Sequence, residues 1–341
     1  MSLPPRLSVA NYGISTGHVG LFSGLRDKFY RQYPQYDTSR TWFINLANGI
    51  GDIVATAGLC KAFRDVHDCR RIVCLIGESR AELVRIYSHL MDAYIVIPTQ
   101  LSFPRDECID FEPNSLICPS KSYVYDGAWV NFAVANRVPI LDWYKLGMRL
   151  PMSAKLESPD WGVLDDDAWS DEAARIRGRK TGVILFPYTN YGSRLPIGVW
   201  EKVSQELNRN GIDVYTNIGT KMNASLAERT NEIIAPISGT NGLALSVVET
   251  MRLLRSGFGG IFGSGGLAWL SALTGAKTVV IYNTDSIDAS LLNSCYAPSI
   301  WTMDKSHEAI GRSMPGLKNL SEVLATDDGV ARAVDFVTTT Q

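Results

Sequence analysis

The sequence has few of the residues that build metal centres. Its 341 residues include four histidines and six cysteines. The histidines are scattered, no two cysteines form a Cys-x-x-Cys pair, and their spacing fits no zinc module. We therefore expect free thiols in a reducing compartment and no metal site.

Long apolar runs and an excess of basic residues are missing as well. No apolar run reaches the length of a membrane-spanning helix, and Met1–Pro5 lacks the basic and apolar regions of a signal peptide. The formal net charge is −2, which indicates no surface for nucleic acid. We expect a cytoplasmic protein. Contact with the inner face of the membrane would be peripheral at most, because no basic amphipathic helix stands out.

The composition is that of a globular chain, with 45% hydrophobic and 20% charged residues, and the length suggests two domains. From Thr41 onward, apolar runs alternate with segments of helical period, which predicts a parallel sheet covered by helices. The expected strands of this first half are 41–46, 71–76, 94–98 and 114–118. The expected helices are 21–33, 52–66 and 79–91.

Residues 151–180 change character, with prolines, an acidic run at 165–167 and a basic run at 175–180. We read this stretch as a surface connector and predict one domain at 1–160 and a second at 161–341. The second half alternates again. Its expected strands are 183–186, 212–218, 260–262 and 277–282, and its expected helices are 197–207, 224–233, 247–254, 267–274 and 329–337. The predicted fold is α/β, with two Rossmann-like parallel-sheet domains facing a central cleft.

The most informative turn is Asn48–Asp52, which joins the first strand to a helix. Glycine there lets a ligand approach the backbone closely. Asp52 then lies at the helix N-terminus, at the carboxyl end of the strand. It is either a helix cap or a catalytic base, and the residues alone leave both open. The turn is no dinucleotide fingerprint, because Val54 stands where the third glycine belongs. Asp52 would also repel a diphosphate, so we expect the nucleotide on the second domain.

Two turns of the second half are candidates for that nucleotide. Gly263–Gly266 opens a helix, where backbone N–H groups could bind a diphosphate, and Ser264, Gly265 and Gly266 are its predicted ligands. The alternative is a tight turn in which glycine serves only the backbone. In the segment 186–196, Thr189 and Ser193 could bind phosphate oxygens, and Arg194 could neutralise a leaving diphosphate. The alternatives are helix caps and a solvated charge. Gly219 and Lys221 follow the next strand and could lie near the nucleoside.

The three segments, in this order, resemble the heptosyltransferase-type inverting glycosyltransferases, which have the GT-B fold. That family has a Gly-x-Gly-Asp turn, as in Gly49–Asp52. It also has a strand leading to a turn with Thr or Ser, then Lys-x-Trp-Pro and a Trp in the next helix, where Thr189, Pro196 and Trp200 match. Its late Asp-Ser/Thr-Gly-x-x-His turn falls on Ser264–Trp269. The resemblance covers roughly residues 41–283.

The chain departs from that pattern at three positions. The family's lysine falls on Ser193, with Arg194 adjacent, its late aspartate on Ser264 and its histidine on Trp269. The lysine and aspartate contact the donor in that family, so the donor sugar cannot be carried over. The resemblance implies a metal-independent inverting glycosyltransferase with Asp52 as general base. It would use a nucleotide-diphosphate sugar as donor substrate and a saccharide or glycolipid as acceptor, without a further cofactor.

Two other functions remain open at this point. The three departures would also suit a GT-B-fold protein that binds a nucleotide sugar without turning it over. A GT-B-shaped sugar-nucleotide epimerase is the second alternative. Such an enzyme needs a histidine in the cleft, and none of the four histidines lies in the turns described above.

Overall fold

The computed structural model describes twelve stretches of the chain. They are residues 6–8, 21–46, 49–98, 103, 108, 110–119, 140–179, 181–188, 195–219, 234–263, 265–283 and 319–339. The chain divides into two compact units, one formed by Met1–Val163 and the other beginning at Leu164. The division falls in the connector predicted from composition. The boundary after residue 160, the roles of the two domains and a cleft between them stay predictions.

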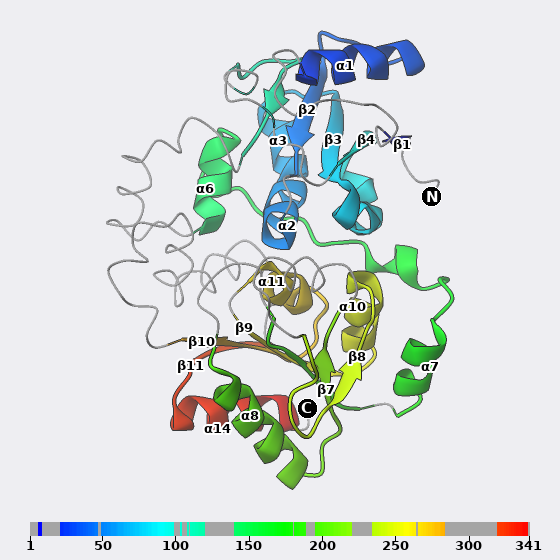
Figure 1. The fold of residues 1–341 in the computed structure, drawn as a ribbon. Helices are drawn as coiled ribbons and strands as arrows, with labels where there is room; N and C mark the ends of the chain where they lie inside the picture. The colour runs from blue at the N-terminus through cyan, green and yellow to red at the C-terminus, as the bar shows by residue number, and fades with distance from the viewer. Residues whose placement is uncertain are drawn as a thin grey trace. The chain divides into compact units, whose positions relative to one another are not determined.

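The first unit contains a parallel sheet of five strands, and the prediction of α/β architecture is confirmed (Figure 1). The order across the sheet is β1-β4-β3-β2-β5, and every neighbouring pair is parallel. Strand order therefore reverses between β2 and β5, with β3 and β4 on one side of β2. The strands are β1 (Arg6–Ser8), β2 (Thr41–Asn45), β3 (Arg71–Gly77), β4 (Ala93–Ile97) and β5 (Leu116–Ile117).

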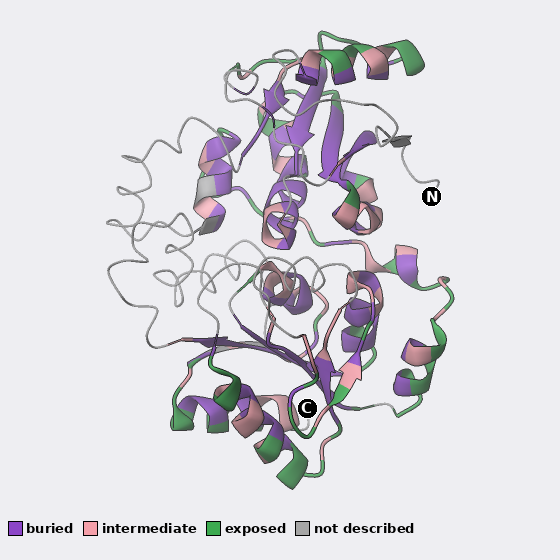
Figure 2. Ribbon diagram, viewed as in Figure 1, coloured by how far each residue is buried: buried purple, intermediate pink, exposed green. Residues whose placement is uncertain are grey.

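Both faces of this sheet are buried, which explains why its strands are continuous apolar runs (Figure 2). On one face, Phe22 and Phe29 of α1 (Leu21–Gln32) pack edge-on against Phe43 of β2, with ring centroids 5.3 and 5.7 Å apart. On the other face, Trp42 of β2 meets Phe63, at 5.1 Å. The helices that follow β2 are α2 (Ile50–Gly58) and α3 (Cys60–Val66), and α6 (Ile140–Gly147) contacts α2.

The second unit contains a six-stranded parallel sheet in the order β11-β10-β9-β6-β7-β8. Read from β8 to β11, with β6 counted as strand 1, this is the order 3-2-1-4-5-6 of doubly wound dinucleotide-binding folds. The chain thus reverses direction across the sheet between β6 and β9. The strands are β6 (Val183–Phe186), β7 (Val214–Asn217), β8 (Asn241–Leu243), β9 (Gly259–Gly263), β10 (Thr278–Tyr282) and β11 (Leu320–Leu324).

Helices cover both faces of the second sheet (Figure 1). On one face, α8 (Ile197–Arg209) packs beside α14 (Asp327–Thr338), and Trp200 of α8 is buried in the core. As predicted, glycine ends α8: Gly211 has a left-handed φ of 72° directly after the cap. The other face carries α10 (Val247–Arg255) and α11 (Gly266–Ala272), and the short α7 (Asp171–Arg177) lies in the connector.

Two predicted helices take a different form. The segment 79–91 consists of η1 (Glu78–Leu83), α4 (Val84–Tyr87) and η2 (Ser88–Leu90), so tight 3₁₀ turns replace most of one long helix. The segment 52–66 is interrupted at Leu59, where α2 ends and α3 begins. The predicted helix 224–233 lies outside the described residues. Elements β1, β8, β11, α6, α7 and the short η5 (Trp161–Leu164) were not predicted.

The prediction of free cysteines is confirmed for the five that the structure describes, and Cys295 lies outside the described residues. The Sγ atoms of Cys108 and Cys118 lie 3.1 Å apart, a thiol contact and not the roughly 2.05 Å of a disulfide. No helix in the described part of the chain is long and apolar enough to cross a membrane.

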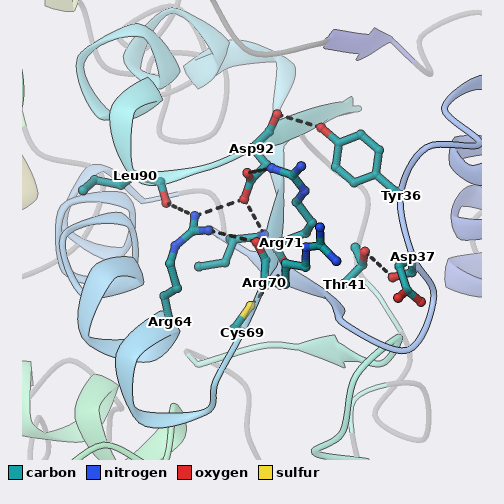
Figure 3. A network of polar contacts seen from close by, with 10 residues as sticks. Tyr36, Asp37, Thr41, Arg64, Cys69, Arg70, Arg71, Leu90 and Asp92 are labelled. Atoms are coloured by element: carbon teal, nitrogen blue, oxygen red, sulfur yellow. Dashed lines mark hydrogen bonds and ion pairs between the residues drawn. The ribbon is translucent and has the colours of Figure 1, made fainter.

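An ion network fastens the amino ends of β3 and β4 (Figure 3). Asp92, just before β4, accepts hydrogen bonds from Arg64 at 3.0 Å, from Arg71 at 2.7 Å and from the backbone N–H of Ile72 at 2.9 Å. Its side chain is 14% exposed, so these donors replace much of its water. The network lies at the end of the sheet opposite to the turn that holds Asp52.

Replacing Asp92 with alanine is expected to lower the free energy of unfolding by about 1.5 to 3 kcal/mol, the usual worth of hydrogen bonds to a charged group. Urea denaturation measures the change. Asp65→Ala is the matched control, because Asp65 is exposed on α3 and should change stability by less than about 0.5 kcal/mol. Equal effects of the two substitutions would show that the network adds nothing.

Candidate functional site

In each sheet, the place to look for a ligand is the carboxyl end of the strands where strand order reverses. In the first unit these strands are β2 and β5. Asn45, the last residue of β2, is buried and its amide lies 3.6 Å from the Sγ of Cys118, just after β5. The turn that carries Asp52 begins at the same end of β2. The predicted base therefore lies at the reversal point of the first sheet.

Asp52 is the third residue of α2 and caps this helix from within. Its Oδ2 accepts a hydrogen bond from the backbone N–H of Gly49, at 3.1 Å. The helix-cap interpretation is therefore correct as far as it goes. The cap uses only part of the hydrogen-bonding capacity of the carboxylate, because each of its oxygens has two lone pairs.

The second oxygen of Asp52 is held from another helix. The hydroxyl of Tyr144, on α6 and 92 positions later in the chain, donates a hydrogen bond to Oδ1. The side chain of Tyr144 is buried. The carboxylate is thus fixed by one donor from its own turn and one from α6.

The electrostatics of Asp52 come from burial and from these two donors. Burial raises the pKa of the carboxyl above its ordinary value, and the hydrogen bonds from Tyr144 and Gly49 oppose that rise. The charged residues of α6 are paired with each other: Lys145 lies 3.1 Å from Asp142 and also donates to the carbonyl of Met152. Among the described residues, the Asp52 carboxylate therefore receives its hydrogen bonds from neutral donors and not from a cation.

The glycine before α2 has a specific steric reason. A Cβ on Gly49 would collide with Oδ2 of Asp52. Its backbone is extended, with φ −87° and ψ 145°, so the residue is not needed for an unusual conformation. Glycine is required because the carboxylate approaches the backbone so closely.

In the second unit the strands that flank the reversal are β6 and β9. The last residue of β6, Phe186, is in register with Phe262 of β9, and the two rings stack in parallel with centroids 4.0 Å apart. The two turns predicted to bind nucleotide follow these neighbouring strands. Of the predicted ligands, five lie outside the described residues: Thr189, Ser193, Arg194, Lys221 and Ser264.

The described glycines of the candidate site differ in whether their backbone conformation requires glycine. Gly219, after β7, has a left-handed φ of 42°, so the backbone alone accounts for it. In the turn after β9, Gly265 is extended, with φ 164° and ψ 170°, and neither Gly263 nor Gly266 is left-handed. Backbone conformation does not require glycine at those three positions.

Two tyrosines of these regions escaped the sequence analysis. Tyr144 was not among the predicted site residues, although its hydroxyl contacts Asp52. Tyr188, two residues after β6, exchanges hydrogen bonds with the backbone of Ala235 through its hydroxyl, which fixes the start of the 186–196 segment. No local pattern could have found either contact, since the partners are 92 and 47 positions apart.

The described residues contain no group of three or more His, Cys, Asp or Glu side chains that could hold a metal ion. No family model matches the chain and no curated protein matches it significantly.

Solved structures of glycosyltransferases are similar to this chain. E. coli ADP-heptose LPS heptosyltransferase II has 10% sequence identity and a TM-score of 0.48, over 87% of this chain and 97% of that one. E. coli heptosyltransferase WaaC has 12% identity and a TM-score of 0.46, over 86% and 98%. The iron-containing dodecameric glycosyltransferase TibC from enterotoxigenic E. coli has 14% identity and a TM-score of 0.46.

The TibC match covers 72% of this chain but only 59% of the TibC chain, so this protein spans less than two thirds of that one. Because every one of these TM-scores lies below 0.5, the fold assignment rests on the strand order of the two sheets. Heptosyltransferases, which the sequence motifs resemble, are among the structures to which the chain is similar.

Proposed function

We propose that the protein is a metal-independent inverting glycosyltransferase of the GT-B type. It transfers a sugar from a nucleotide-diphosphate donor to a hydroxyl of a saccharide or glycolipid acceptor, in the synthesis of bacterial surface polysaccharides or glycoconjugates. The observation that carries the proposal is the reversal of strand order between β6 and β9, from which both predicted nucleotide turns depart.

The donor belongs on the second unit for three reasons. Its sheet has the strand order of dinucleotide-binding folds. Its reversal point is followed by a turn whose glycines the backbone does not require. The first unit, in contrast, presents the carboxylate of Asp52 at its own reversal point, and a carboxylate repels a diphosphate. Thr189, Ser193, Arg194 and the Ser264–Gly266 turn would hold the diphosphate, with Gly219 and Lys221 near the nucleoside.

The acceptor belongs on the first unit, beside Asp52. The carboxylate would take the proton of the acceptor hydroxyl as its oxygen attacks the anomeric carbon. The bond from that carbon to the diphosphate breaks on the opposite side, so a single displacement inverts the configuration. Arg194 and backbone N–H groups would stabilise the charge on the departing nucleoside diphosphate.

A panel of ADP, GDP, UDP and CMP and their sugars tests the proposal by thermal shift. One nucleoside diphosphate is expected to raise the melting temperature, because saturation at 100 times Kd adds about 2.7 kcal/mol to stability. Product analysis with the sugar of that nucleotide then tests for transfer or hydrolysis. Binding without either reaction would favour a non-catalytic nucleotide-sugar-binding protein.

Two glycine variants locate the donor. Gly265→Val should abolish the shift, since the backbone of Gly265 is extended and tolerates valine while the side chain occupies the space beside it. Gly198→Ala is the matched control in the same unit, because a Cβ there meets nothing within 4 Å. Undiminished binding by Gly265→Val would place the nucleotide elsewhere.

A further inference from the structure

Each carboxylate oxygen of Asp52 accepts a hydrogen bond, and only one of the two donors belongs to the turn before α2. The Gly49 N–H is a local cap that many helices have. The Tyr144 hydroxyl is different, because α6 has to pack against α2 to deliver it. We propose that Tyr144 is a positioning residue, which orients the Asp52 carboxylate toward the acceptor and keeps it ionised. This inference rests on the proposed function, in which Asp52 is the base.

The geometry of the pair suits that role. A carboxylate oxygen accepts at two positions, and among the described residues Tyr144 and Gly49 each occupy one, which leaves a second position on each oxygen. With both oxygens held, the carboxylate cannot rotate about its Cβ–Cγ bond without losing a donor. The free positions therefore point in fixed directions, as a general base requires.

The chemistry of a phenol also suits it. A Tyr hydroxyl donates a proton to the hydrogen bond without bringing a charge, so it stabilises the carboxylate without neutralising it. Lysine or arginine in its place would pair with the carboxylate as an ion. The cation of α6, Lys145, is instead engaged by Asp142 and by the carbonyl of Met152. Lys61 of α3 pairs with Glu157 at 3.0 Å.

The direction of the effect on titration follows from the balance of causes. Burial raises the pKa of Asp52, and the Tyr144 hydrogen bond counteracts that rise. Without the hydroxyl the pKa rises further. The carboxyl then holds its proton up to a higher pH, and the fraction of enzyme with a competent base falls on the acid side of the pH profile.

Tyr144→Phe tests the proposal, because it removes the hydroxyl and keeps the buried ring. Tyr87→Phe is the matched control: Tyr87 is a fully buried tyrosine of the same unit, and its hydroxyl has no hydrogen-bond partner in the described structure. Carbon-13 labelling of aspartate carboxyls, with Asp52→Asn to assign the resonance, gives the pKa of Asp52 in each protein.

The expected result is a higher pKa of Asp52 in Tyr144→Phe, with no change in Tyr87→Phe. The acid limb of kcat against pH moves up with it, and kcat on the plateau falls by about tenfold, the kinetic equivalent of one hydrogen bond to a charged group. An Asp52 pKa that is the same in Tyr144→Phe and wild type overturns the proposal.

Should the phenylalanine variant not fold, the pair is measured from the other side. In protein labelled at the tyrosine Cζ carbons, Asp52→Asn is expected to shift one tyrosine resonance, and an unchanged set overturns the proposal. The pKa measurement needs no transfer activity. Transfer that survives Asp52→Asn would remove the base from the proposed function. An Asp52 pKa that is unchanged in Tyr144→Phe is a different result, and it would overturn only the role of Tyr144.

Discussion

Replacing Asp52 with asparagine is expected to lower kcat for sugar transfer by about 10²- to 10⁴-fold, the usual contribution of a general base. Asparagine has nearly the size of aspartate, and its side-chain oxygen can still accept the hydrogen bond from the Gly49 N–H. It cannot take a proton from the acceptor. The substitution therefore separates the cap, which it keeps, from the base, which it removes.

The measurement is initial rate with the donor identified by the nucleotide panel, together with a thermal melt of the variant. Stability should change by no more than about 1 kcal/mol, the worth of a cap. Affinity for the nucleotide should be unaffected, since the donor is assigned to the second unit. Near wild-type turnover in a folded Asp52→Asn protein would leave Asp52 as a cap alone.

Trp200→Ala is expected to destabilise the second unit by about 3 to 5 kcal/mol, as loss of a large buried aromatic does. The indole is 1% exposed and belongs to the core beneath α8, together with Leu207, Ile261 and Val330. Truncation leaves a cavity between α8 and the sheet that the neighbouring side chains cannot fill. Trp200 matches the family pattern, and its burial gives that match a structural reason.

Urea denaturation, monitored by circular dichroism, measures the change in the free energy of unfolding. Ile197→Ala is the control on the same helix, because its side chain is 55% exposed and should contribute less than about 0.5 kcal/mol. Trp200→Phe should lose less than the alanine variant, since the indole N–H has no acceptor among the described residues. A loss below 1 kcal/mol for Trp200→Ala would contradict the assignment of this core.

The fold could be predicted from the sequence where the strands are central. β2, β3 and β6 are buried on both faces, and such strands appear as unbroken apolar runs. The strands that were missed lie at the edges. β8 is only Asn-Gly-Leu, and β11 carries serine and glutamate, so hydrogen bonding to a neighbour defines them more than composition does.

The candidate site could be predicted only in its local part. Gly49–Asp52 places the carboxylate at the start of α2 because a glycine turn and a helix start are short-range patterns. The bond from Tyr144 joins residues 92 positions apart, and no spacing in the sequence encodes it. The close approach of Oδ2 to Gly49 likewise needs coordinates, although the glycine itself was the signal.

The strand order of the second sheet also bears on how that unit is made. β6 is its first strand, and each later strand pairs with one already present: β7 beside β6, β8 beside β7, then β9 on the free side of β6, followed by β10 and β11. The sheet can therefore grow outward from its middle during synthesis. In the first sheet β1 pairs only with β4, so it must wait for a strand that emerges some 90 residues later. We expect its docking to be the slow, late step in the folding of that unit, because pairing of strands far apart in sequence closes a long loop.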